Sequence, residues 1–468
     1  MNYISTRKGL SATSAETIFR GLAPDGGLYV PDIGSTRLPR WIEPTLRNCA
    51  ETVAETLFGD IPADVRHEAV DRLVARFPAE DPIPLVERGG FRMLELFHGR
   101  TGAFKDVALS MLPVLMRHAA GGRRVLVLTA TSGDTGSAAM QGFAGVDGTE
   151  IVVFYPAAGT SRIQRLQMTT PADANVHAVG IRGNFDDAQA AVKRIFADRA
   201  IADEAAARGV TLSSANSINT GRLVPQVAYY VLAVQRLTLE FGAPYLRTSG
   251  IDVVVPSGNF GNILAAYYAK LLGAPIGRLV VASNVNDVLA RFVRTGIYDP
   301  GPDFAVTNSP SMDIRISSNV ERLLWILNDG DCGEVSRLMD DLARTGRYEL
   351  RDAAKGRLAS DFDGGVATPE ETEAEMRRMR ADCGCLIDPH TAVATCVARK
   401  LGYPRGRAPC VVAATATPYK FPETCLRAFG EDVLADPPQC IRELDGLPVA
   451  QTAVVDVCDI PGAVRALL

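Results

Sequence analysis

One lysine is placed for covalent chemistry. Lys105 lies between small and aromatic residues at the start of an apolar, helix-patterned run that includes Val107, Leu109 and Leu112. Apolar surroundings disfavour the ammonium form, so the amine of Lys105 should lose its proton more easily than a solvated lysine does. A neutral amine can attack an aldehyde carbonyl. The alternative is a surface lysine whose carbon chain lies along apolar residues, so the motifs around Lys105 decide between the two.

A glycine-rich turn follows the apolar run Val125–Leu128. Its residues, Thr129–Gly136, carry several hydroxyls and lead into a helix pattern. Free backbone N–H groups at a helix N-terminus bind anions. Asp134 would repel a phosphate, so the turn suits a carboxylate-and-hydroxyl site, or a contact with a cation or phenolic proton. The alternative is an ordinary capped turn.

A second turn of this kind follows the run Val253–Val255. Residues Pro256–Asn262 place Gly258 and Gly261 on either side of Asn-Phe, directly before an apolar helix pattern. The backbone amides of residues 258–262 could form a concave phosphate site, to which the helix dipole adds. The segment is neither a P-loop nor the dinucleotide glycine motif. A reactive lysine, a phosphate site and a carboxylate site together are what a pyridoxal-phosphate (PLP) enzyme acting on an amino acid requires.

The elements that position these groups alternate between apolar strands and helices. Most strand candidates are followed by a Gly/Ser/Pro-rich turn and a helix pattern, which predicts α/β architecture with largely parallel, doubly covered sheets. The strands fall into two clusters, around 125–155 and from 252 onward, so we expect two sheet domains with a cleft between them. The candidates are Val125–Leu128, Ile151–Phe154, Val253–Val255, Leu279–Val281 and Val411–Val412.

The predicted organisation has three parts. Residues 1–90 are expected to form a mixed, more helical N-terminal domain. Residues 91–245 should hold the reactive lysine and the carboxylate loop, and residues 246–468 the glycine-rich phosphate loop. Within the last part, residues 318–382 are charged, strand-poor and helix-patterned, which predicts a helical insertion.

Composition excludes several classes of function. The 468 residues carry a net charge of −5, and basic residues are scattered, which argues against nucleic-acid or membrane-surface binding. No apolar run is long enough to span a bilayer, and the N-terminus lacks a signal layout, so we expect a cytoplasmic protein. Nine cysteines fit reduced thiols, and the five histidines show no ligand spacing, so no metal site is expected.

An ordered series of motifs makes the chain resemble the threonine synthase family almost from end to end. The resemblance implies a tryptophan synthase β-like, fold type II PLP architecture, in which two doubly wound open-sheet domains follow a family-specific N-terminal domain. The motifs include Gly21–Pro31, the Lys105 run, Ala130–Gly136, Asn216–Asn219 with Arg222 and Gln226, Pro256–Asn262, Asn284–Asp287, Ser309–Ile314, Ile387–Ala392 and Thr415–Phe421.

The resemblance also implies site residues. Lys105 would hold PLP as a Schiff base and shuttle protons, and Thr415 would offer its hydroxyl to the pyridine nitrogen. Asp134 would lie near the phenolic oxygen of the cofactor, whose phosphate would be bound by Gly258, Asn259, Phe260, Gly261 and Asn262. The substrate carboxylate would be held by Thr131, Ser132, Gly133 and Thr135. The candidates for the substrate phosphate are Arg162, Asn216, Ser217, Arg222 and Lys420.

The family reaction converts O-phosphohomoserine and water to threonine and phosphate. The resemblance therefore implies a carbon–oxygen lyase that acts on a small phosphorylated amino acid as a monomer or homodimer. Premature entry of water would release a keto acid, so domain closure should accompany binding. His390 is interpreted as a hydrogen-bonded residue of its turn rather than a catalytic base.

Three residues depart from the family pattern: Arg100, Thr417 and Tyr419. An added guanidinium at position 100 could strengthen phosphate binding or indicate a different anionic substrate. A threonine synthase-like lyase or replacement enzyme that acts on another activated amino acid therefore remains the alternative. A catalytically silent homologue is disfavoured, because the lysine and both loops are intact.

Overall fold

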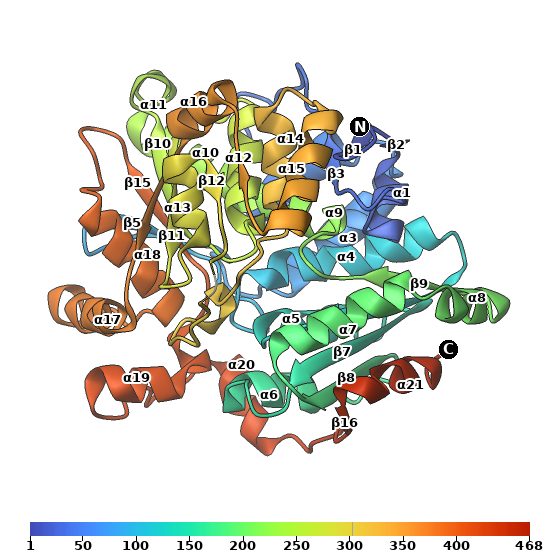
Figure 1. Cartoon of the computed structure of the whole chain (residues 1–468). Helices are drawn as coiled ribbons and strands as arrows, with labels where there is room; N and C mark the ends of the chain where they lie inside the picture. The colour runs from blue at the N-terminus through green and yellow to red at the C-terminus, as the bar shows by residue number, and fades with distance from the viewer. Residues whose placement is uncertain (302) are drawn as a thin grey trace.

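Two open sheets form the frame of the molecule in the computed structural model, which describes residues 1–301 and 303–468 (Figure 1). The first sheet is parallel throughout and has five strands. Its order is β16 (Val454–Asp456), β8 (Val176–Arg182), β7 (Thr149–Pro156), β6 (Arg124–Ala130) and β9 (Val210–Ser214).

The second sheet has six strands and is parallel except at one edge, where β4 runs antiparallel to β5. Its order is β14 (Phe362–Val366), β11 (Ile276–Ser283), β10 (Ile251–Pro256), β15 (Cys410–Ala414), β5 (Phe91–Glu95) and β4 (Leu85–Arg88). All five strands predicted from the apolar runs are therefore present, and the α/β prediction is confirmed.

Helices cover both faces of the first sheet, because its strands are apolar on both sides. On β6, Val125 and Val127 pack into one core and Leu126 and Leu128 into another. Successive side chains of a strand point to opposite faces, so a continuous apolar run requires two covers. One face packs against α4 (Lys105–Ala120) and α5 (Asp134–Phe143), the other against α7 (Phe185–Ala197), α8 (Arg199–Ala207) and α21 (Ile460–Arg465).

The second sheet is covered in the same way. Val253 and Val255 of β10 face the core they share with α10 (Val227–Phe241) and α12 (Gly261–Leu271), whereas Val254 faces α17 (Pro369–Cys383) and α18 (Pro389–Lys400). Further helices of this lobe are α11 (Ala243–Ser249), α13 (Val288–Thr295), α14 (Val320–Leu327), α15 (Cys332–Thr345), α16 (Asp352–Asp361) and α19 (Pro422–Phe429).

The N-terminal part packs against both lobes: Arg72 donates hydrogen bonds to the carbonyls of Gly142 and Ala144 in the first lobe. It combines a three-stranded antiparallel sheet, β2-β1-β3, with three helices. Arg7 forms an ion pair of 2.6 Å with Glu321 of α14, and buried Arg322 donates a hydrogen bond to the carbonyl of Tyr29. Figure 1 shows this part beside α14 and α15. Its elements are β1 (Tyr3–Ser5), β2 (Ser11–Ala12), β3 (Tyr29–Pro31), α1 (Ser14–Arg20), α2 (Leu46–Leu57) and α3 (Ala63–Ala75).

The sheets do not follow the predicted boundaries at residues 90 and 245. Strand β5 precedes α4 in the chain but pairs with β15 in the second sheet. Residues 454–468 return to the first lobe, where β16 pairs with β8. The predicted helical insertion 318–382 contains α14–α17, but it also supplies β14, the edge strand beside β11. Which sheet a strand joins depends on pairing between distant segments of the chain, and local sequence patterns do not encode that pairing.

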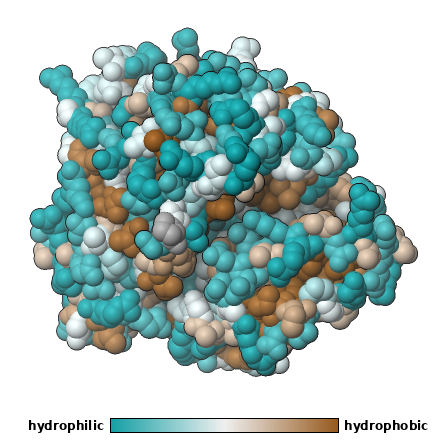
Figure 2. Space-filling view, viewed as in Figure 1, coloured by the Kyte–Doolittle hydropathy of each residue, from teal (hydrophilic) through white to brown (hydrophobic). Residues whose placement is uncertain are grey.

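The carboxyl ends of β6, β10 and β15 face the cleft between the two lobes, where open α/β sheets bind their ligands. In Figure 2, a hollow lies between the upper and lower lobes on the face shown. Across the described residues, no helix has both the length and the apolar character needed to cross a bilayer.

Candidate active site

The loops after β6, β10 and β15 meet in a cavity of about 110 Å³ between the lobes. It is lined by Lys105 and by most of the residues predicted from the motifs. The predicted lining residues are Thr131, Ser132, Asp134, Thr135, Asn216, Ser217, Arg222, Gly258, Asn259, Phe260, Gly261, Asn262 and Thr415.

Lys105 is the first residue of α4 and is only 8% exposed. Its Nζ lies 3.3 Å from Asp134 Oδ2 and 4.4 Å from the centroid of the Phe104 ring. Burial lowers the pKa of Lys105; Asp134 opposes this effect, whereas the positive charges of Arg222 and Lys420 lower the pKa further. The amine is therefore easier to deprotonate than a solvated lysine, as its apolar surroundings predict.

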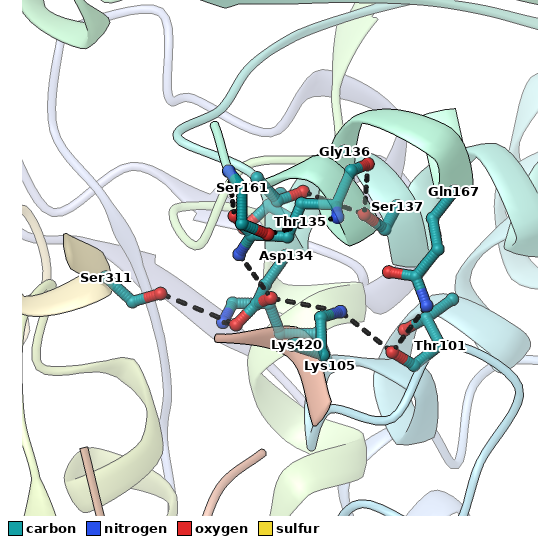
Figure 3. Close-up of polar contacts among 12 residues, drawn as sticks. Thr101, Lys105, Asp134, Thr135, Gly136, Ser137, Ser161, Gln167, Ser311 and Lys420 are labelled. Carbon is teal, nitrogen blue, oxygen red and sulfur yellow. Dashed lines mark hydrogen bonds and ion pairs between the residues drawn. The ribbon is translucent and has the colours of Figure 1, made fainter. Parts of the chain in front are cut away.

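Asp134 begins α5 and joins groups from both lobes (Figure 3). Its Oδ1 accepts a hydrogen bond of 2.8 Å from Gln164 and lies 3.0 Å from the Nζ of Lys420. Its Oδ2 faces Lys105 and accepts a bond of 3.4 Å from the Ser311 hydroxyl. Burial alone would raise the pKa of Asp134, but Lys420 and Lys105 hold it well below its usual range. The side chain is therefore a carboxylate.

The turn before α5 is organised by Thr131. Its hydroxyl accepts hydrogen bonds from the backbone N–H groups of Gly133 (2.9 Å) and Gly136 (3.0 Å). Gly133 has φ +151°, and a Cβ there would lie 2.4 Å from the Gln164 side chain, so only glycine fits. The turn thus keeps Gln164 against Asp134.

The second loop is organised around the N-terminus of α12. Phe260 has φ +61°, and the first helical bond runs from Leu264 N–H to its carbonyl. The amide oxygen of Asn262 accepts hydrogen bonds from the hydroxyls of Tyr229 (2.7 Å) and Tyr230 (2.6 Å). This orients the buried amide so that Nδ2, which has no partner among the described residues, is free to donate. Among those residues, no acceptor is present for the N–H groups of residues 258–263 either.

Arg222 supplies the cation in the cavity wall. It is 6% exposed; one NH group donates to the carbonyl of Ala215 and the other, at 3.1 Å, to the hydroxyl of Thr135. Burial lowers the pKa of Arg222 to about 10, so it remains charged at neutral pH. Asn216 is beside it in the lining and donates to the Ala130 carbonyl.

Thr415 follows β15 and is 5% exposed in the cavity wall. Its carbonyl accepts a hydrogen bond from the N–H of Phe104, which places it beside the lysine. His390 also lines the cavity, and its Nε2 accepts a hydrogen bond of 3.2 Å from the Ser311 N–H. Its Nδ1 lies 2.8 Å from Asp388 Oδ1, so the proton of the neutral ring is on Nδ1.

Three predicted substrate residues do not line this cavity. Gly133 shapes the turn from behind, and Lys420 is fully buried on the far side of Asp134. Arg162 is at the start of α6 (Arg162–Thr169), where its half-exposed side chain forms an ion pair with Asp445. The three residues that depart from the family pattern, Arg100, Thr417 and Tyr419, are also outside the lining.

Polar residues at the site that were not predicted as site residues include Gln164, Gln226, Ser311 and His390. Gln226, Ser311 and His390 belong to the family motifs but carry no local sign of their role. Gln164 is part of the helix-capping motif Ser161–Gln164, which the sequence analysis did not use. Among the described residues, no group of three or more potential ligands could hold a metal ion.

Three family models match the chain. Residues 91–416 match the pyridoxal-phosphate dependent enzyme model, residues 2–73 the threonine synthase N terminus and residues 391–467 the threonine synthase C-terminal region. Threonine synthase of Pseudomonas aeruginosa is 37% identical, over 92% of this chain and 90% of that protein. The chain belongs to the threonine synthase family.

Members of the threonine synthase family with solved structures share the fold. The PLP-bound threonine synthase from Brucella melitensis superposes with a TM-score of 0.89 over 100% of this chain and 99% of that one, at 36% identity. Human threonine synthase-like 1 is 36% identical over 89% of this chain, which corresponds to 58% of the human protein. The expected PLP-dependent fold and cofactor class are therefore confirmed.

The residues present fit PLP. The cofactor phosphate matches the free N–H groups at the start of α12 and the unpaired Nδ2 of Asn262. A Cβ on Gly258 would lie 2.7 Å from the Ser311 carbonyl oxygen, so the loop has no room for a side chain there. Lys105 and Thr415 both line the cavity, where they could offer an amine to an aldehyde and a neutral hydroxyl to a ring nitrogen.

Proposed function

We propose that this member of the threonine synthase family converts O-phosphohomoserine and water to threonine and phosphate. The observation that carries the proposal is the buried amine of Lys105, held against Asp134 in a cavity with an N–H-rich loop on one wall and Arg222 on another. The site thus offers an amine with a lowered pKa for the cofactor aldehyde, an N–H-rich loop for the cofactor phosphate and a separate cation for the substrate phosphate.

PLP, when held by Lys105 and residues 258–262, would supply an electron-withdrawing ring that stabilises negative charge on the α-carbon of an amino acid. Lys105 Nζ is the basic atom of the cavity placed to take the α-proton of the substrate and to return a proton later. Asp134 keeps this amine oriented across the 3.3 Å contact. Thr415, whose carbonyl accepts the N–H of Phe104 beside the lysine, is proposed to meet the ring nitrogen through its hydroxyl as a neutral partner.

The substrate carboxylate is assigned to Thr131, Ser132 and Thr135, at the N-terminus of α5, where hydroxyl and N–H donors are available, and Gly133 only shapes their turn. Arg222 is proposed to bind the substrate phosphate, with Asn216 and Ser217 as neutral donors. A guanidinium can donate two parallel hydrogen bonds to phosphate, and burial strengthens them. Arg162 and Lys420, the other predicted phosphate ligands, receive no support from their positions outside the cavity lining.

The mouth of the cavity opens into a second, wider hollow that shares Phe185, Asn259 and Ile314 with it. Phe185 begins α7 of the first lobe, and Ile314 is in the second. We propose that the lobes approach each other across this mouth and exclude water while the substrate is held. The enzyme is proposed to act in the cytoplasm on a small molecule, as a monomer or homodimer.

The test is an assay panel of O-phosphohomoserine, O-phosphothreonine and O-acetylhomoserine with identification of the products. Threonine and phosphate formed in equal amounts from O-phosphohomoserine support the proposal. Preferential turnover of another substrate would support the alternative, a lyase or replacement enzyme. The match to human threonine synthase-like 1 is the reason to test this alternative. Absence of any lysine-bound cofactor after reduction with borohydride would contradict both.

A further inference from the structure

A second lysine belongs to the site without facing the cavity. Lys420 is 0% exposed, and its Nζ lies 3.0 Å from Asp134 Oδ1 and donates a hydrogen bond of 2.8 Å to the Thr101 carbonyl. Both contacts are visible in Figure 3, where Lys420 and Lys105 approach the same carboxylate. Because Lys420 does not line the cavity, a substrate phosphate would have to displace Asp134 to reach it.

The two oxygens of Asp134 have different partners. Oδ1 is held by Lys420 and Gln164, which have no exposure to the cavity, whereas Oδ2 meets Lys105 and Ser311, which do. When the amine of Lys105 bonds to an aldehyde or is released, its ion pair with Oδ2 changes. A buried carboxylate that loses its counter-ion is strongly destabilising, so a second, permanent cation is needed on Oδ1.

Lys420 follows a segment that pairs with the residues directly before Lys105. Ala103 forms a β-bridge with Ala416, and the N–H of Thr417 donates to the Gly102 carbonyl. The short helix that contains Lys420 (Pro418–Lys420) follows directly. The contact between Lys420 and Asp134 is therefore maintained by backbone pairing between residues 102–104, directly before Lys105, and residues 415–417.

We propose that Lys420 is a positioning residue: it is the permanent counter-ion of Asp134 and so leaves the amine of Lys105 free to react. The inference rests on the proposed bond between PLP and Lys105. Lys420, which the sequence suggests as a candidate for the substrate phosphate, is thereby reassigned as the partner of the Asp134 carboxylate beside the reactive amine.

The charges around Lys105 give the sign of the expected effect. Burial lowers the pKa of Lys105, Asp134 raises it, and Arg222 and Lys420 lower it. Arg222 is committed to Thr135 and the Ala215 carbonyl, and His390 adds positive charge near Asp134 only when it is protonated. Removing the charge of Lys420 removes its repulsion of the Lys105 ammonium. It also leaves Lys105 as the only lysine paired with Asp134. Both effects keep Lys105 protonated to higher pH.

The experiment measures how fast PLP bonds to Lys105 as a function of pH. Full-length protein freed of cofactor is mixed with PLP between pH 6 and 10, the absorbance of the lysine-bound cofactor is followed, and the bonded lysine is identified after borohydride reduction. The variants are Lys420→Met, which removes the charge at similar size, and Lys420→Arg, which keeps it. Lys400→Met is the matched control, because Lys400 also bonds a carbonyl (Val366) and a carboxylate (Glu371) but is half-exposed and distant.

We expect the inflection of the rate–pH profile to move up by about one pH unit in Lys420→Met, the size of effect that one neighbouring charge produces. Lys420→Arg and Lys400→Met should keep the parent profile. In steady state at pH 7, Lys420→Met should lower kcat more than it raises KM. An unchanged profile with only a raised KM for O-phosphohomoserine would overturn the proposal and return Lys420 to the substrate phosphate.

If Lys420→Met does not fold, the double variant Asp134→Asn, Lys420→Met removes both charges and carries the same measurement. Its profile should lie above that of Asp134→Asn alone; identical profiles would overturn the proposal. If the parent protein forms no bond at Lys105, the proposed function fails. If the parent bonds normally and Lys420→Met matches it, only this inference fails.

Discussion

The two loops that face each other across the cavity differ in the charge that they carry. The loop after β6 carries a full negative charge, Asp134, with two lysines around it. The loop after β10 carries no charged side chain between Pro256 and Asn262; it offers backbone N–H groups and the amide of Asn262, which two tyrosine hydroxyls orient. The first loop sets the protonation of a reactive amine, and the second fits a fixed dianion by shape. Charge changes should therefore dominate in the first loop and geometric changes in the second.

The largest effect is expected for Lys105→Ala. Removal of the amine takes away both the point of cofactor attachment and the basic atom, so turnover should fall by at least about 10³-fold, within the range known for loss of an acid–base group. Absorbance of the lysine-bound cofactor should disappear as well. If turnover stayed at a tenth of the parent value, Lys105 would not be the reactive amine, and the comparison of the two loops would lose its basis.

Asp134→Asn should follow in size. The amide keeps the shape but leaves Lys420 and Lys105 without an anion, and an unpaired buried charge costs about 3–5 kcal/mol. The free energy of unfolding, from chemical denaturation, should fall accordingly. Asp134 raises the pKa of Lys105, so its loss should move the pH profile of cofactor bonding to lower pH, opposite to Lys420→Met. A shift in the same direction for both variants would contradict the assignment of charges in the first loop.

Gly258→Ala probes the geometry of the second loop. The new Cβ would lie 2.7 Å from the Ser311 carbonyl oxygen, a backbone atom that cannot turn aside. We expect the Kd for PLP to rise at least about tenfold, equivalent to about 1.4 kcal/mol, with no change in the pH profile of bonding at Lys105. The matched control is Gly446→Ala, because a Cβ there meets nothing within 4 Å. Equal affinities in the two variants would show that the loop adapts.

Arg222→Met tests the third charge. Its buried guanidinium is proposed to bind the substrate phosphate, so the KM for O-phosphohomoserine should rise about 10- to 100-fold, as the loss of a charge-assisted contact of about 1.5–3 kcal/mol predicts. Binding of PLP should change little. Arg208→Met, in a half-exposed ion pair with Glu204 on α8, is the control.

Arg162→Met should have the smallest effect, because an exposed ion pair such as that with Asp445 is worth about 0–1 kcal/mol. A KM change as large as that of Arg222→Met would place Arg162 in the substrate site after closure of the lobes. The pair of arginine variants thus decides which predicted cation the substrate phosphate meets.

Local patterns were sufficient for five strands, β6, β7, β10, β11 and β15, and for the loops that carry the chemistry. The apolar run Val125–Leu128 indicates a strand buried on both faces, and the glycines before α12 indicate an N–H-rich turn. The lowered pKa of Lys105 also follows from its apolar neighbours. These features depend on residues that are adjacent in the chain, so the sequence contains them directly.

The partners of Asp134 were not predictable in this way. Lys420 and Ser311 reach it from far along the chain, and only the folded cleft brings the segments together. The same holds for β5 and β16, which cross to the other lobe and make the predicted boundaries at residues 90 and 245 differ from the sheets. Arg162 follows the capping residue Ser161 on α6, and the direction of a side chain at a helix start depends on what packs beneath it.

The return of residues 454–468 to the first lobe has a consequence for synthesis on the ribosome. Strands β6, β7, β8 and β9 are made early, but β16, which covers the edge of β8, emerges only after the whole second lobe. Until then the nascent chain exposes an unpaired strand edge and the apolar surface that Ile460 and Val464 later bury. The first lobe should therefore reach its final stability only after residues 454–468 have emerged, and the nascent polypeptide is most prone to aggregate before then.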